Sequence, residues 1–223
     1  MREIVVDTET TGLDPRDGHR VVEIGCIELE NHIPTGRTFH TYVNPERDMP
    51  AAAFNVHGLS EAFLADKPLF AAVADDLLTF LADSALVIHN AGFDMAFLNA
   101  ELSRLGHVAL TPDRAIDTVS MARRKFPGAQ ANLDALCRRF GVDNSGRTKH
   151  GALLDAELLA EVYLELIGGR QPGLGLALTP GTTAVVTETK RIRREPRHFA
   201  PSPDELSAHN TFVEKLKEPI WRA

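Results

Sequence analysis

The sequence has only two cysteines, Cys26 and Cys137, and no apolar run that approaches the roughly 18–20 residues needed to span a bilayer. Both cysteines lie among periodically spaced apolar residues. This context argues against a disulfide framework or a cysteine-based zinc site and predicts buried free thiols. Charge follows Met1 directly, at Arg2 and Glu3, which is too early for the apolar core of a signal peptide. We therefore expect a cytoplasmic protein.

Charge is unevenly distributed along the chain. The 223 residues include 24 basic and 31 acidic side chains, for a formal net charge of −7. Residues 171–223 have a small basic excess, so residues 1–170 carry the whole negative balance. This balance does not exclude a nucleic-acid partner, because clustered carboxylates can hold metal ions. An apolar fraction of 43% is ordinary for a globular protein and excludes disorder of the whole chain.

The composition changes after Gly168-Gly169, where prolines become frequent and large apolar residues rare. Such a segment is typical of a linker. We expect a compact domain at 1–170, a linker at 171–201 and a C-terminal element at 202–223. In that element, Ser202 and the two residues after Pro203 have the pattern of a helix start with a capping box.

The first domain is predicted to be α/β. Segments rich in β-branched or alternating residues predict strands, and apolar residues at helical spacing predict helices. Three sequential strands followed by alternating strands and helices indicate a mixed sheet flanked by helices. The expected strands are Glu3–Thr8, Val21–Glu30, Arg37–Val43, Ala85–Ile88 and Ala115–Asp117; the expected helices are Leu69–Leu81, one ending at Leu105, one capped by Asn132, and Ala152–Ile167.

Four acidic residues occupy positions where a core would favour apolar ones. Asp7 and Glu9 project from the same face of the first strand, while Asp94 and Asp155 lie on otherwise apolar helical stripes. A buried carboxylate is costly unless it is paired or bound to metal, and no basic residue nearby in sequence is placed to neutralise these four. Asp and Glu oxygens are the ligands that Mg²⁺ and Mn²⁺ favour.

Each acidic residue also has a simpler interpretation. An isolated Asp-x-Glu pair is usually a solvated loop. Asp94 and Asp155 each lie near the start of a helix, where the helix dipole favours an acid. Neither interpretation explains the neighbouring residues.

The neighbouring residues form three ordered motifs, namely Asp7-Thr8-Glu9-Thr10-Thr11-Gly12, His89-Asn90-Ala91-Gly92-Phe93-Asp94 and His150-Gly151-Ala152-Leu153-Leu154-Asp155. Together they resemble the exonuclease motifs of the DEDDh family of 3′→5′ exonucleases, which have a ribonuclease H-like fold. The resemblance covers nearly the whole chain and is strongest to proofreading members of bacterial replicases.

The resemblance implies a metal-dependent mechanism. It assigns Asp7, Glu9, Asp94 and Asp155 as ligands of two divalent ions, Mg²⁺ or Mn²⁺, and His150 as the general base. A histidine with a pKa near 6.5 is largely neutral at pH 7 and can accept a proton from water.

The resemblance also implies substrate contacts in the first two motifs and near His57. For Phe93, plain core packing is an equal alternative. His19, His32, His40 and His107 follow no such pattern and are interpreted as surface or satisfied structural residues. The expected substrate-binding residues are Thr10, Gly12, Leu13, His57, His89, Asn90 and Phe93.

Residues 171–223 have two features that predict binding to partner proteins. Residues 171–176, with Gln171, Leu174 and Leu176, resemble a sliding-clamp-binding peptide, although a Gly/Pro-rich linker explains them as well. The apolar residues of the last helix, including Leu206, and Trp221 after it have no local core to cover them. They would either pack back on the first domain or bind a partner. The resemblance implies that this partner is the alpha subunit of DNA polymerase III. It is also compatible with a further partner, a small theta-like subunit.

The sequence thus predicts a 3′→5′ DNA exonuclease that proofreads a primer end, releases nucleoside 5′-monophosphates and works in a nucleoid-associated replisome. One alternative is a 3′→5′ exoribonuclease of the same family. Another is a non-catalytic replisome adaptor that keeps only the binding tail.

Overall fold

The computed structural model describes residues 1–147, 149–169 and 200–217. The chain divides into two compact units, Met1–Leu176 and Ala177–Ala223. Within the described residues, no helix has both the length and the apolar character required to cross a membrane. The clamp-like residues Gln171, Leu174 and Leu176, as well as Trp221, lie outside the described residues.

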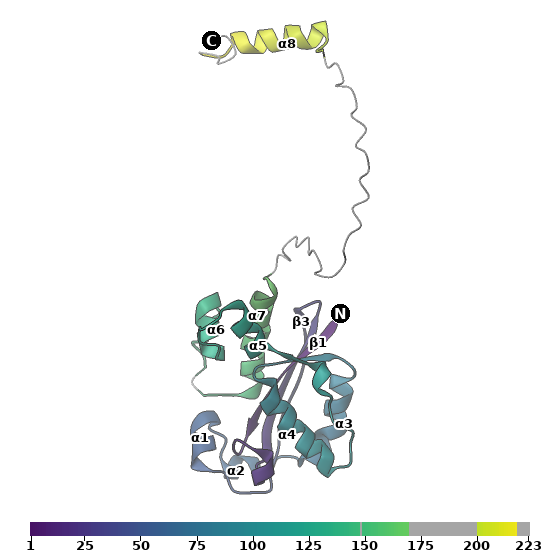
Figure 1. Ribbon diagram of the computed structural model, residues 1–223, viewed down its shortest axis with the longest axis vertical. Helices are drawn as coiled ribbons and strands as arrows, with labels where there is room; N and C mark the ends of the chain where they lie inside the picture. The colour runs from purple at the N-terminus through teal and green to yellow at the C-terminus, as the bar shows by residue number, and fades with distance from the viewer. Residues whose placement is uncertain (148, 170–199, 218–223) are drawn as a thin grey trace. The chain divides into compact units, whose positions relative to one another are not determined.

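The first unit is built on a five-stranded mixed sheet (Figure 1). The strand order is β3-β2-β1-β4-β5, so β1 is central. β1 pairs antiparallel with β2 and parallel with β4, which in turn is parallel to β5. The mixed sheet predicted from sequence is confirmed. The strands are β1 (Arg2–Thr10), β2 (Val21–Glu30), β3 (Ile33–Tyr42), β4 (Ala85–Ile88) and β5 (Ala115–Asp117).

The helices flank this sheet, and the long ones agree with the sequence prediction. Asn132 caps its helix as predicted, because its side chain accepts a hydrogen bond from the N–H of Ala135. Three short helices were not predicted, namely α1, α2 and α5. The helices are α1 (Ala51–His57), α2 (Glu61–Leu64), α3 (Phe70–Leu81), α4 (Ala91–Arg104), α5 (Thr118–Lys125), α6 (Leu133–Phe140) and α7 (Ala152–Ile167).

The sheet separates two hydrophobic cores. Ile4 and Val6 of β1 belong to a core with side chains of α3 and α4. Val5, on the opposite face, belongs to a core with side chains of α6 and α7. The period-2 alternation of β1 therefore supplies both cores from one strand. Cys26 and Cys137 are buried free thiols, one in each core, as predicted.

The second unit contains α8 (Pro203–Glu214). Its start has the predicted capping box: the Ser202 side chain accepts from the Glu205 N–H, and the Glu205 carboxylate accepts from the Ser202 N–H. Leu206 and Phe212 on this helix are exposed.

A close approach between α7 and β2 sets the position of the α7 N-terminus. Gly25 lies opposite Asp7 in the β1–β2 register. A Cβ atom on Gly25 would lie 2.3 Å from the carbonyl carbon of Ala152, the first residue of α7. Only glycine allows this contact, so Gly25 brings the first turn of α7 against the strand pair that carries Asp7.

We predict that Gly25→Ala lowers the free energy of unfolding by about 1–3 kcal/mol, because the added methyl group meets backbone atoms that must shift. Urea denaturation measures the effect. Gly92→Ala is the matched control, since a Cβ there meets nothing within 4 Å and alanine favours a helix. Equal stability of the two variants would show that the α7 N-terminus is not held this tightly.

Candidate active site

The two acidic residues of β1 lie at the carboxyl end of the central strand. Asp7 and Glu9 continue the face on which Val5 packs toward α7, as the alternation predicted. Glu9 is buried, and Glu23 lies directly opposite it on β2. Carboxylates therefore gather at this edge of the sheet, where parallel β1 and β4 both end.

Asp94 reaches the same edge from the other helical layer. It lies in the first turn of α4, which follows β4, and it is buried. Its Oδ1 accepts hydrogen bonds from the Thr8 N–H at 3.0 Å and from the Thr8 hydroxyl at 2.7 Å. Asp94 is thus a helix-start acid, and it is also fixed to the strand that carries Asp7 and Glu9.

Asp155 reaches the site from α7, and its pairing differs from what the sequence predicted. It is buried in the first turn of that helix. Arg147 donates to both of its oxygens, with Nε–Oδ1 and Nη2–Oδ2 distances of 2.5 Å. The expectation that no basic residue neutralises the four carboxylates is therefore wrong for Asp155. Arg147 lies on an irregular segment before α7, so helical spacing gave no sign of the contact.

The electrostatics of the four carboxylates are unequal. Burial, followed by repulsion from Asp94, Glu9 and Asp155, raises the pKa of Asp7 well above its usual value. Burial is also the main cause that raises the pKa of Glu9 to about 8 and that of Asp94 to about 7. Burial acts the same way on Asp155, but hydrogen bonds from His150 and Arg147 outweigh it and lower its pKa.

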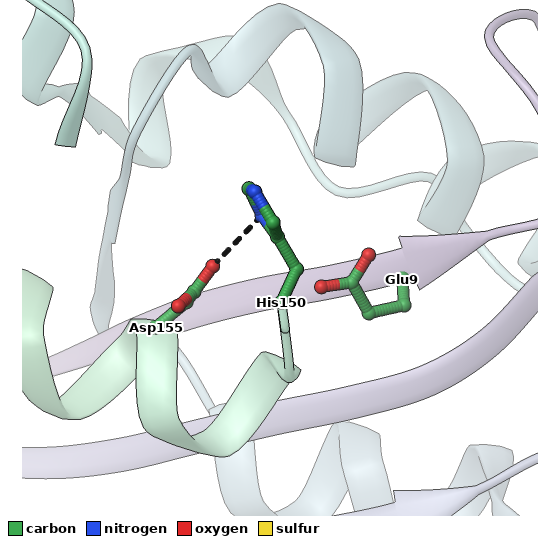
Figure 2. Close-up of side chains that lie close together, drawn as sticks. All are labelled: Glu9, His150 and Asp155. Atoms are coloured by element: carbon green, nitrogen blue, oxygen red, sulfur yellow. Dashed lines mark ion pairs between the residues drawn. The ribbon is translucent and has the colours of Figure 1, made fainter. Parts of the chain in front are cut away.

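The site offers a donor set suited to a divalent cation. Donor atoms of Glu9, His150 and Asp155 lie within 4.8 Å of one another (Figure 2). His150 Nδ1 is 3.2 Å from Asp155 Oδ2. Asp7 and Asp94 do not join this group among the described residues, although Glu9 and Asp155 raise the pKa of Asp7, and Asp94 raises the pKa of Glu9. The raised pKa values of Asp7, Glu9 and Asp94 show that ionising these buried carboxylates is costly, and a bound cation would relieve that cost.

A cavity of about 530 Å³ adjoins the carboxylates and is lined by both β1 and α1. The structure brings five of the seven predicted substrate-binding residues to its wall, namely Thr10, Gly12, Leu13, His57 and Phe93. Leu13 is 86% exposed, which is unusual for a large apolar residue. Phe93 also packs on Phe97, with ring centroids 4.9 Å apart, so core packing and the cavity wall share this side chain.

The other two predicted residues lie elsewhere. His89 lines a smaller cavity with Asp7, His150 and Asp155, and its Nδ1 is 2.9 Å from the Thr118 hydroxyl. Asn90 is exposed at the start of α4, where it adopts a left-handed conformation and its N–H donates to Asp117. Asn90 thus shapes the turn that leads to Asp94.

Sequence reasoning missed two residues at the site. Arg147 is one. The other is His19, which was interpreted as structural and does pair with Thr11, but which also lines the larger cavity. A Cβ on Gly12 would lie 2.3 Å from the His19 ring, so Gly12 makes room for it. His32, His40 and His107 are each paired with an acidic residue, as a structural role predicts.

Comparison with known proteins identifies the family. The exonuclease family RNase_T matches residues 4–163. DNA polymerase III subunit epsilon of Rickettsia felis is 53% identical over 222 residues, which cover 97% of each chain. The Escherichia coli protein of the same name is 40% identical over 238 residues, which cover 100% of this chain and 98% of that one.

Solved structures agree in fold. The nuclease domain of 3′hExo, a DEDDh family member bound to rAMP, has a TM-score of 0.64 at 20% identity over 74% of this chain and 91% of that one. Exonuclease X in complex with 5′ overhanging duplex DNA has a TM-score of 0.58 at 26% identity over 74% and 90%. With its RNase H-like fold and its full-length similarity to epsilon subunits, the chain belongs to the RNase_T exonuclease family, in the group of DNA polymerase III epsilon subunits.

Proposed function

We propose that this 3′→5′ exonuclease proofreads DNA by hydrolysing the last phosphodiester bond of a frayed primer and releasing a nucleoside 5′-monophosphate. The observation that supports this most strongly is the carboxylate cluster beside a cavity large enough for a nucleotide. Full-length similarity to epsilon subunits favours a DNA primer over the alternative RNA substrate. The intact set of acidic residues disfavours a non-catalytic adaptor.

In this proposal Asp7, Glu9, Asp94 and Asp155 hold two divalent ions, Mg²⁺ or Mn²⁺. Such ions neutralise the phosphate and stabilise the charge that develops on the leaving 3′ oxygen. The chain supplies the geometry, because two helical layers and the central strand deliver the four carboxylates to one point. Use of divalent ions is typical of the exonuclease family and fits the donor set.

His150 is proposed to take the proton from the attacking water. Its imidazole is about half exposed, so water can reach it, and the Asp155 carboxylate beside it stabilises the imidazolium that forms. The backbone N–H of His150 donates to the Val56 carbonyl at 3.2 Å, which ties the segment before α7 to α1. His150 therefore lies beside Asp155 and is tied by its backbone to α1, the helix that lines the larger cavity.

The terminal nucleotide is proposed to occupy the larger cavity. The backbone from Thr10 to Gly12 would hold its 3′-hydroxyl, and Leu13 and Phe93 would contact its base. His57 is buried at the cavity wall, where burial lowers its pKa, and its Nε2 has no hydrogen-bond partner among the described residues. A neutral imidazole with a free nitrogen is suited to contact a sugar or phosphate oxygen. His89 and Asn90 would support the site from the second motif.

Residues 171–223 are proposed to join the enzyme to its replicase. Leu206 on α8 and Trp221 would dock on the alpha subunit of DNA polymerase III, and Gln171, Leu174 and Leu176 would bind the sliding clamp. The exposed apolar residues of α8 support the first contact. A small theta-like subunit would bind as a further partner. This role places the enzyme in the cytoplasm, at the nucleoid-associated replisome.

We predict that Asp7→Asn abolishes hydrolysis yet stabilises the metal-free protein near pH 8. A carboxylate whose pKa is higher in the folded than in the unfolded state contributes its full stability below about pH 4. That contribution is lost progressively as the pH rises from about 4 to the folded-state pKa values of about 7 and 8. Removing one charge reduces this loss. Thermal unfolding in a chelator from pH 5 to 8 measures it.

Asp155→Asn is the matched comparison for Asp7→Asn. It should also abolish hydrolysis, but it should destabilise the metal-free protein, because it removes the ionised partner of the buried Arg147. If both variants shift stability in the same direction, the unequal charges inferred for the two carboxylates are wrong.

Replacing His150 with alanine should lower turnover by roughly 10²–10⁴-fold, the range for a lost general base. Single-turnover hydrolysis of single-stranded DNA measures the rate, and calorimetry with Mn²⁺ measures metal affinity. The assignment requires metal affinity to stay within a few-fold of wild type. A parallel loss of affinity and rate would make His150 a ligand instead.

Deleting residues 203–223 should leave hydrolysis of free single-stranded DNA nearly unchanged and eliminate stable binding to the polymerase alpha subunit. Trp221→Ala alone should weaken that binding by ~2 kcal/mol or more, as buried aromatic anchors do. Gln171→Ala with Leu174→Ala should weaken only clamp binding. Full-affinity capture of the polymerase by the truncated chain would place the docking site on the nuclease domain.

A further inference from the structure

Arg147 makes three kinds of contact with the active site. Its side chain is 7% exposed, and it binds both oxygens of Asp155. Its Nη1 donates to Asp134 Oδ1 on α6 at 2.8 Å. Its Nη2 also lies 2.7 Å from His150 Nδ1. One guanidinium thus connects a predicted metal ligand, the predicted base and a third residue, Asp134, to which no role has been assigned.

Asp155 differs from the other three carboxylates in its ion pairing. Within the described ranges, Asp155 forms an ion pair with an arginine and the other three do not. An arginine fork that engages both oxygens of a carboxylate occupies the positions that a cation would use and places a positive charge beside them. A divalent ion that approaches Asp155 therefore meets both a competitor and a like charge.

Asp134 provides an alternative position for the same guanidinium. Its side chain is 44% exposed, so it stays hydrated and ionised at little cost. It also accepts from the Asn144 side chain at 3.0 Å, which anchors the irregular segment that carries Arg147. If Asp155 turns toward a cation, Arg147 can keep Asp134 as its partner rather than remain as an uncompensated buried charge.

We propose that Arg147 is a built-in competitor for the metal site, which neutralises Asp155 while the enzyme is metal-free and moves its pairing to Asp134 when a divalent ion binds. This inference rests on the proposed role of Asp155 as a metal ligand. It makes Arg147 and Asp134 positioning residues that set metal affinity without binding metal themselves.

Two substitutions should change metal affinity in opposite directions. Arg147→Gln should increase the affinity for Mn²⁺ on the order of tenfold, because a unit charge a few ångströms from a divalent ion is removed. Asp134→Asn should decrease it several-fold, because Arg147 is then left with Asp155 alone. A purely structural role would make both variants bind Mn²⁺ more weakly.

The experiment is calorimetric titration of the full-length protein with Mn²⁺ alone, together with thermal unfolding with and without Mn²⁺. Arg138→Gln, an exposed arginine of α6, is the control for net charge. Arg147→Gln should be less stable than wild type in chelator, and saturating Mn²⁺ should reduce that difference. Because Asp134 is 44% exposed, Asp134→Asn is expected to fold, and an unchanged Mn²⁺ affinity in that variant would refute the competition even if Arg147→Gln folds poorly.

Asp155→Asn separates this proposal from the metal-site assignment. If that variant binds Mn²⁺ as wild type does, Asp155 is not a ligand and the proposed metal site fails with the competition. If it loses Mn²⁺ binding while Arg147→Gln shows no gain and Asp134→Asn no loss, the metal site stands and the competition by Arg147 is refuted.

Discussion

The convergence of four carboxylates at the end of one central strand is the constraint on which the site depends. The fold delivers Asp7 and Glu9 from β1, Asp94 from the layer of α3 and α4, and Asp155 from the layer of α5 to α7. Burial raises the pKa of three of them, so ionising these carboxylates together inside the fold is costly. A bound cation would relieve that cost, which is why we propose a metal site here.

Two local features make the convergence compatible with a folded chain. Gly25 lets the N-terminus of α7 approach β2 closely enough to bring Asp155 to Asp7. Arg147 pairs with both oxygens of Asp155 and neutralises its charge. Gly25 acts by leaving space for the backbone of α7, and Arg147 acts through its charge. Both affect the first turn of α7. In the proposed metal site, binding of metal and positioning of α7 would therefore be linked.

Local patterns in the sequence predicted where the carboxylates lie, and the three ordered motifs were needed to predict their role. Period-2 alternation placed Asp7 and Glu9 on one face, and helical spacing placed Asp94 and Asp155 on stripes that are buried in the structure. The long helices and the strands of the sheet were predictable for the same reason. The helix-dipole interpretation of Asp94 and its role in the cluster are both compatible with its position in the first turn of α4.

The features that were not predictable depend on the path of irregular segments. Arg147 reaches Asp155 because the chain between α6 and α7 folds back, and no periodic pattern encodes that path. α1 and α2 are too short for a periodic signal, although α1 supplies His57 to the cavity. In the sequence, Gly25 resembles any other strand residue, and only the structure shows its contact with Ala152. The roles of these residues could be recognised only from the tertiary structure.

Anomalous diffraction from crystals grown with Mn²⁺ tests the central claim most directly. The account predicts manganese peaks bounded by Asp7, Glu9, Asp94 and Asp155, with Arg147 paired to Asp134 instead of holding both oxygens of Asp155. Manganese bound away from these carboxylates, with the Arg147–Asp155 pair intact, would contradict it.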